Sequence, residues 1–194
     1  MANCGKSKWL LSVLVLMFIG QSCGGVKDRP SPQRPDQAPA KAPAAKQHMA
    51  AGEYQNAIND YSAEYRSRPQ DQALVKEYVK SLEVIKTVAD KAFDKEDFAS
   101  AGKTYDILRK NYSHFNAFVQ KLSFDKAHLN TKLSHCRKSL STQGFQEYRK
   151  GNLGGAIVLW QSLLAFDPDN ADIKGAVRTA MLQKKNMQES GAGR

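Results

Sequence analysis

The chain has 194 residues, and 29 Lys and Arg against 19 Asp and Glu give it a formal net charge of +10. Its length and its 41% content of hydrophobic residues suffice for one domain with its own core after the terminal segments are set aside. Only Cys136 lies in the part that we expect to fold, which excludes an intramolecular disulfide there.

The first 22 residues have the composition of a signal peptide. Lys6 and Lys8 make its start positive, and an apolar run from 9 to 19 follows, interrupted only by Ser12. The run is too short to span a bilayer comfortably, but it suits the core of a signal peptide. The small residues Gly20 and Ser22 predict cleavage after residue 22.

Cys23 follows this cleavage site, and the segment resembles a bacterial lipoprotein signal, in which the cysteine becomes the acylated first residue. The segment departs from that family at Gly20, where leucine is usual. The resemblance implies export, palmitate on Cys23 and attachment to the cell envelope. Because residue 24 is a glycine and not an aspartate, the resemblance favours the periplasmic side of the outer membrane. The alternatives are an ordinary secretory signal and a transmembrane anchor.

Residues 23–46 form a spacer in our interpretation. Five of the seven prolines lie between positions 26 and 46, and Val26 is the only large apolar residue in that stretch. Such a composition cannot build a core, so we expect an extended linker. The folded domain is expected to span 47–190.

A helical period dominates the rest of the chain, and no segment alternates as a strand does. We expect the domain to be all-α, with Ser123 as an N-cap and Asp169 or Asn170 as another. Ile173, Val177, Ala180 and Met181 should share one side of the last helix. The expected helices are one through Met49, then 54–67, 72–93, 98–111, a short piece at 115–122, one from 123 to 150, 153–165 and 171–187.

Three stretches repeat one pattern, an alanine followed four positions later by an aromatic residue. Gly52 and Gly151 precede two of these alanines, Gly144 lies further upstream in the third stretch, and Pro69 and Pro168 follow two of them. The pattern resembles the tetratricopeptide repeat, a helix–turn–helix unit. The alanine and aromatic pairs are Ala57 and Tyr61, Ala101 and Tyr105, and Ala156 and Trp160.

The resemblance implies a short, divergent helical-hairpin solenoid of about three units plus a C-terminal capping helix. The alanines are 44 and 55 positions apart, however, where the family has about 34. The second unit departs most, because Glu96 replaces the turn glycine and Ser113 the final proline. The alternative is an unrelated helical bundle in which these alanines and aromatics are ordinary core residues.

Residues that often carry chemistry are scattered. His128 and His135 are two helical turns apart, too far to share a metal ion, and no hydrolase, phosphate-loop or zinc motif is present. Cys136 continues an apolar stripe with Leu133 and Leu140, so we expect it to be buried. We therefore expect no enzyme, no cofactor and no metal site.

The stretch from Lys103 to Lys150 carries 10 Lys and Arg against 3 Asp and Glu. Export argues against nucleic acid as its partner. The basic side chains either form a solvated face or meet anionic lipid, cell-wall polymer or an acidic protein. Those on one long predicted helix are Lys126, Lys132, Arg137, Lys138, Arg149 and Lys150.

In the repeat family, the first helix of each unit lines a concave surface that binds protein partners. The resemblance therefore implies a lipid-anchored scaffold or adaptor for protein–protein interaction in the envelope. A soluble periplasmic binding module and an envelope assembly factor, such as a pilotin or an outer-membrane assembly protein, are the alternatives. The alternative for the same surface residues is that they pack against the inserted segment 115–122. The candidate binding residues are Lys86, Asp90, Phe93, Lys138, Ser141, Phe145, Tyr148 and Arg149.

Overall fold

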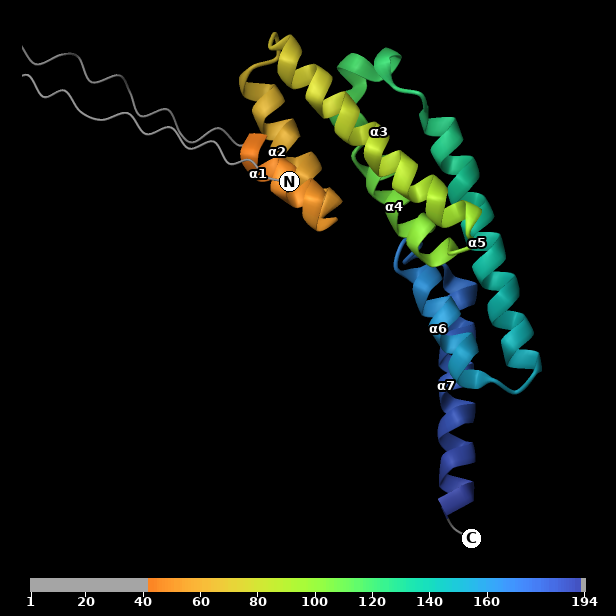
Figure 1. Cartoon of the computed structure of the whole chain (residues 1–194). Coiled ribbons are helices and arrows are strands. Elements are labelled where there is room, and N and C mark those ends of the chain that lie inside the picture. Colours follow the sequence, from red (N-terminus) through yellow and green to blue (C-terminus); the bar gives the residue numbers. More distant parts are fainter. Residues whose placement is uncertain (1–41, 193–194) are drawn as a thin grey trace, which may run out of the picture. The chain divides into compact units, whose positions relative to one another are not determined.

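The structure is a computed structural model that describes residues 42–192. The signal peptide, Cys23 and most of the expected spacer lie outside the described residues. Within 42–192 the fold is all-α, as predicted, and consists of eight helices (Figure 1). They are α1 (Ala42–Ala51), α2 (Tyr54–Ser67), α3 (Gln72–Asp94), α4 (Phe98–Lys110), the 3₁₀ helix η1 (Tyr112–Lys121), α5 (Lys126–Arg149), α6 (Leu153–Leu164) and α7 (Ala171–Ala192).

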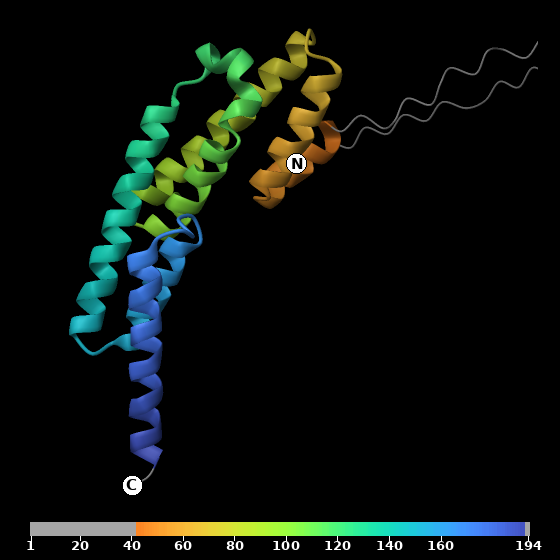
Figure 2. The same ribbon diagram turned by 180° about the vertical axis from the view of Figure 1, so that it is seen from behind.

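Neighbouring helices pack as sequential antiparallel pairs. The pairs are α1 with α2, α3 with α4, and α5 with α6, and α7 packs against α6 (Figures 1 and 2). Helix α5 also runs along α4 and so joins the second pair to the third. The inserted η1 packs against α3 and α4. Helices that are consecutive in the sequence therefore make most of the contacts.

The helix boundaries agree closely with the sequence-based expectations, apart from the starts of α1, η1 and α5 and the end of α7. Helix α1 begins at Ala42, inside the expected spacer. A proline is tolerated in a first helical turn, so Pro43 does not prevent this start. Helix α7 continues past its expected end, and Met181 is 45% exposed instead of sharing the buried side of Ile173 and Val177.

The expectation that Ser123 caps α5 is wrong. Asp125 is the N-cap, because its carboxylate accepts a hydrogen bond from the backbone N–H of His128 at 2.7 Å. Ser123 instead donates its backbone N–H and its hydroxyl to the two carboxylate oxygens of Glu83, each at 2.6 Å. A long-range contact with α3 thus determines the role of Ser123. Asn170, by contrast, caps α7 as expected by accepting from the N–H of Ile173.

The turns inside the three pairs have the same backbone geometry. Gly52, Glu96 and Gly151 have φ angles of +76°, +59° and +80°. At each turn this residue donates its N–H to the carbonyl three positions earlier, and the next residue donates to the carbonyl five positions earlier. These are the two bonds of a Schellman motif at a helix end. Glu96 adopts a left-handed conformation that costs a residue with a side chain about 1–2 kcal/mol.

Small residues are buried on both helices of every pair. Ala57, Ala101 and Ala156 are fully buried on the second helices, as predicted. Twelve positions before each of them the first helix also carries a small buried residue, namely Ala45, Ala89 and Gly144. A methyl carbon added to Gly144 would lie 2.2 Å from Nε1 of Trp160, so the indole occupies the space of a side chain. Close approach of the two helices therefore requires these small residues.

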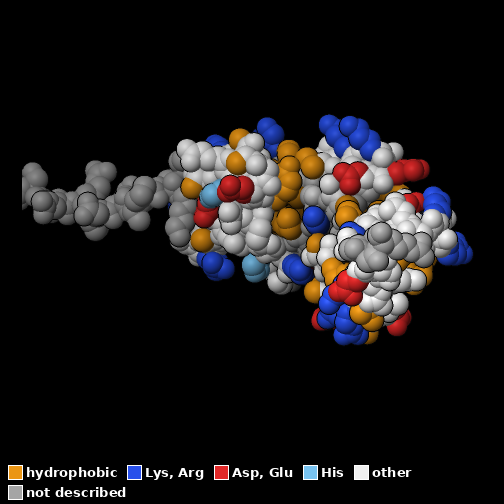
Figure 3. Space-filling view, turned by 90° about the horizontal axis from the view of Figure 1, so that it is seen from below, with side chains coloured by type: hydrophobic (Ala, Val, Ile, Leu, Met, Phe, Trp, Pro, Cys, Tyr) orange, Lys and Arg blue, Asp and Glu red, His pale blue; other side chains and the backbone are white. Residues whose placement is uncertain are grey.

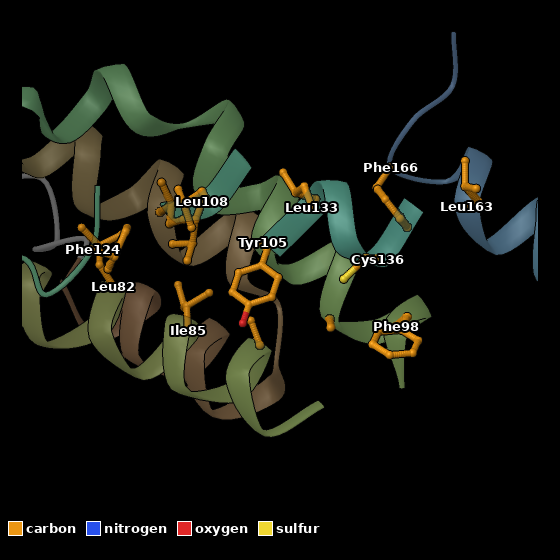
Figure 4. Close-up of a cluster of buried hydrophobic side chains, with 14 of the residues drawn as sticks. Leu82, Ile85, Phe98, Tyr105, Leu108, Phe124, Leu133, Cys136, Leu163 and Phe166 are labelled. Carbon is orange, nitrogen blue, oxygen red and sulfur yellow. The ribbon is translucent and has the colours of Figure 1, made fainter. Parts of the chain in front are cut away.

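Larger apolar side chains fill the α3–α4 pair and its contact with α5. Leu82 and Ile85 of α3 meet Tyr105 and Leu108 of α4, and Leu133 of α5 closes the same cluster (Figure 4). All five are fully buried. Cys136 is buried there too, as predicted, and this burial raises the pKa of its thiol to about 11.

Candidate functional site

The candidate binding residues on α3 form one polar and aromatic group. Lys86 pairs with Asp90 at 2.8 Å, and the hydroxyl of Tyr105 on α4 donates to the other oxygen of Asp90 at 2.5 Å. Phe93 lies one turn further along α3. Its ring contacts that of His135 on α5 at 4.9 Å between centroids, and the ammonium of Lys132 lies 3.8 Å from its centroid. This group, defined by Lys86, Asp90 and Phe93, is the α3 cluster.

Electrostatics hold the α3 cluster together. Partial burial opposes the ionisation of Asp90, but the hydrogen bonds from Lys86 and Tyr105 outweigh it, so the pKa of Asp90 lies below its usual range. Burial of the Tyr105 ring, together with its bond to Asp90, raises the pKa of that hydroxyl. The carboxylate is therefore charged and the phenol neutral at pH 7. Lys86 and Tyr105 thus satisfy both oxygens of Asp90. Lys132 and the Phe93 ring below it are half-buried.

The candidates on α5 form a second group around Trp160. The Phe145 ring meets the indole edge to face at 5.0 Å, and the Tyr148 ring lies tilted against it at 5.9 Å. Phe145 is nevertheless 43% exposed. The Tyr148 hydroxyl donates to the amide oxygen of Gln183 on α7 at 2.8 Å. Phe145 and Tyr148, with the exposed Arg149 next to them, are called the α5 cluster.

His135 and Lys138 lie between the two clusters along α5. Both line a shallow depression of about 340 Å³ together with polar residues such as Ser139 and Thr142. His135 also contacts the ring of Phe93, so the depression continues from the α3 cluster. The structure thus connects Phe93 to Lys138 through His135, a residue that sequence reasoning placed at no binding surface.

The inserted segment does not cover these candidates with its aromatic rings. Within η1, Phe118 meets Tyr65 and Tyr78 edge to face, at 5.3 Å and 5.2 Å. Phe115 meets Tyr112 at 5.1 Å. Phe115 and Phe118 are both buried, and they serve to join η1 to α2 and α3. These contacts therefore do not support the alternative that the segment fills the surface formed by Phe145 and Tyr148.

The basic residues of the long helix do not form one uniform face. Lys132 lies over Phe93, Arg137 approaches a carboxylate oxygen of Asp167 at 3.1 Å, and Lys150 pairs with Glu147 at 2.8 Å. Lys126 and Arg149 are exposed. Half of the predicted cationic stripe is therefore engaged within the chain, and its other members, Lys126, Lys138 and Arg149, are exposed at the start, middle and end of α5.

The residues that carry the repeat pattern take structural positions. Tyr61, Tyr105 and Trp160 are buried on the second helices, and Gly52 and Gly151 occupy the turns. Pro69 and Pro168 follow α2 and α6, where a proline cannot continue the helix. Sequence reasoning did not assign Ala45 and Ala89 to the repeat pattern, although their distance from the matched alanines equals that of Gly144. The repeated spacing itself was the signal that could have identified them.

Within the described residues, no cluster of three or more His, Cys, Asp or Glu side chains has the geometry to hold a metal ion. None of the described helices combines the length and the hydrophobicity that a bilayer-spanning segment needs. The lipidation expected at Cys23 lies outside the described residues. The chain matches no protein-family model, no curated protein and no solved structure.

Proposed function

We propose that this protein is a scaffold of the bacterial cell envelope, held at a membrane by lipid on Cys23. In this proposal it binds a protein partner through helical pairs of the tetratricopeptide type. The anchor rests on the sequence of the first 23 residues. The role is that of a binding module and not that of an enzyme.

The observation that carries the proposal is the common geometry of the three pairs. Each has a left-handed residue at its turn and, twelve positions apart, a small buried residue on the first helix and a buried alanine on the second. Regular tetratricopeptide units have the same small residues, for the same steric reason. The long spacing between the pairs fits a divergent member, in which a longer α3 and the inserted η1 take up the additional residues.

The surface that we propose for the partner is formed by the α3 and α5 clusters. The α5 cluster offers a half-exposed aromatic ring next to the free guanidinium of Arg149. Rigid aromatic rings and arginine contribute strongly at protein interfaces, because they bury a large area at a low cost in conformational entropy. A peptide with an apolar side chain next to a carboxylate would complement this surface.

The anchor is tested by Cys23→Ser. The protein should move from the membrane fraction to the soluble fraction, and metabolic labelling with palmitate should disappear, since each buried methylene contributes about 0.8 kcal/mol to attachment. A wild-type protein that is already soluble and unlabelled would favour the soluble periplasmic module.

The binding surface is tested by Phe145→Ala combined with Arg149→Glu. Both side chains are exposed enough for their replacement to leave the fold intact. Photo-crosslinking in cells should lose its main partner, while thermal unfolding stays nearly unchanged. Val158→Ala with Lys174→Glu is the matched control, because these exposed residues lie on α6 and α7. If the Phe145 and Arg149 variant keeps the partner, the proposed surface is wrong.

A further inference from the structure

A second concave surface lies between α1 and α3. Met49 and Ala50 of α1 form one wall, Tyr61 of α2 contributes its ring, and Ser81 and Val84 of α3 form the other wall. The depression has a volume of about 320 Å³, and its lining is mainly apolar. Figure 3 shows hydrophobic side chains gathered in a band beside the α1–α2 pair. We call this depression the α1–α3 cleft.

The cleft exists because α3 is much longer than α1. An ion pair of 3.1 Å between Lys46 and Glu77 shows which turns of the two helices lie side by side. From there α1 ends at Ala51, whereas α3 continues to Asp94. At 1.5 Å per residue, about 18 Å of α3 extends past the end of α1. Part of the apolar face of α3 is therefore left without a covering helix.

Two valines mark the uncovered part of α3. Val84 is 43% exposed and Val88 is 36% exposed, and they lie one helical turn apart on the same side. Val84 also lines the α1–α3 cleft, so the valines continue its apolar surface along α3. They belong to neither the α3 cluster nor the α5 cluster.

The charges at the two ends of this strip are positive. Lys80 precedes Val84 by one turn, and Lys91 follows Val88 by nearly one turn. Both lysines are exposed, and the ion pairs found among residues 42–192 include neither of them. Three of the four carboxylates of α3 are engaged within the chain, Glu77 by Lys46 and Tyr61, Glu83 by Ser123, and Asp90 by Lys86 and Tyr105. The fourth, Asp94, is exposed at the end of the helix, three positions after Lys91.

We propose that the α1–α3 cleft and the Val84–Val88 strip bind an acidic amphipathic helix of a partner protein. Lys80 and Lys91 are about 16 Å apart along α3, so the partner helix needs about three turns. It carries apolar residues at helical spacing on one side and a carboxylate near each end. Apolar contacts supply its affinity, and the lysines select its charge and direction.

Charge distinguishes this partner from segments of the chain itself. The spacer contains Lys27, Arg29, Arg34 and Lys41 against Asp28 and Asp36, so the two free lysines disfavour it. The exposed end of α7 in a second copy carries Lys184 and Lys185 and is disfavoured for the same reason. The proposal does not depend on membrane attachment or on Phe145 and Arg149, so its failure would leave the proposed function standing.

The test uses the full-length protein in the cells that produce it. A photo-crosslinking amino acid replaces Val88, and mass spectrometry identifies the peptide attached to it. The expected product is an acidic peptide with apolar residues at helical spacing. Lys80→Glu combined with Lys91→Glu should reduce this product about tenfold, because like charges across an interface are strongly unfavourable.

The matched control is Lys103→Glu with Lys121→Glu, which changes two exposed lysines on α4 and η1 and should leave the product intact. Lys80→Gln with Lys91→Gln should give an intermediate loss, and circular dichroism checks that each variant stays folded. Crosslinks to the spacer, to a second copy or to a basic peptide would overturn the proposal. The proposal is also overturned if the crosslinked product persists in both the double glutamate and the double glutamine variant, or if no product forms.

Discussion

The α5–α6 pair and the α1–α2 pair share one turn geometry, but different interactions stabilise them. In α5–α6 the indole of Trp160 lies directly on Gly144, and Asn152 caps α6 by accepting from the N–H of Gly155. The first residue before α2, Glu53, makes no such capping bond. The third pair is therefore stabilised from within by close packing and a capped helix.

The α1–α2 pair depends more on polar contacts with its neighbours. The hydroxyl of Tyr61 donates to Glu77 at 2.9 Å, and Ser62 shares a buried hydrogen bond of 2.7 Å with the hydroxyl of Tyr78. Gln55 and Asn111 exchange two bonds, at 3.1 Å and 2.8 Å. The rings of Tyr61 and Tyr78 also stack at 5.2 Å. The comparison teaches that one local pattern can produce a pair held by close internal packing or a pair held by polar bonds to the next helices.

The largest effect is expected for Trp160→Ala in the α5–α6 pair. The side chain is fully buried, so its removal leaves a cavity and should lower the free energy of unfolding by about 3–5 kcal/mol. Urea denaturation followed by circular dichroism measures the change. Phe145→Ala, at a half-exposed ring, is the control and should cost much less. Equal losses in the two variants would contradict the central role given to the indole.

A smaller loss is expected for Gly144→Ala. The added methyl meets the indole at a distance that real contacts never reach, so helix or ring must move, at a cost of about 1–3 kcal/mol. Gly154→Ala is the control, because its methyl would meet nothing closer than the end of the flexible Lys184 side chain, at 3.8 Å. That variant should be neutral or slightly stabilising, as alanine favours helices. If both variants change the melting temperature in the same direction, the close contact between Gly144 and Trp160 is refuted.

The polar bonds that hold the α1–α2 pair to α3 are tested by Ser62→Ala. The change leaves the buried hydroxyl of Tyr78 without a partner, which should cost about 1–2 kcal/mol. Hydrogen exchange should become faster in α2 and in the N-terminal half of α3 than in α6. Ser134→Ala, at an exposed position of α5, serves as the control. Faster exchange in all helices alike would mean that the first pair does not open separately.

The smallest effect is expected for Glu96→Gly, and it is a gain. Glycine adopts a positive φ without steric strain, although it also makes the unfolded chain more flexible. We expect the melting temperature to rise, with a net stabilisation of about 0.5–1 kcal/mol. Gly151→Ala, at the equivalent turn, should lower stability by a similar amount. If Glu96→Gly destabilises the protein, the Glu96 side chain has a role that its backbone conformation does not reveal.

Local sequence was sufficient to predict where most helices begin and end. The apolar period of α3 and the prolines after α2 and α6 act within a few residues, so they can be recognised without knowledge of distant contacts. The pattern of alanine and aromatic also predicted which residues are buried at the pair interfaces. For the candidate binding residues, the sequence predicted their helices but not their neighbours, such as His135 against Phe93.

Tertiary structure decided what depends on segments far apart in the chain. Ser123 donates to Glu83, 40 residues away in the sequence, and Asp125 caps α5 in its place. Packing of the second pair holds Glu96 in a conformation that its own side chain disfavours. The exposure of Val84 and Val88 follows from the length of α3 relative to α1, a relation that no single segment contains. The sequence by itself therefore determined the helices and their pairing partners, whereas the fit between pairs decided which surfaces remain open to a partner.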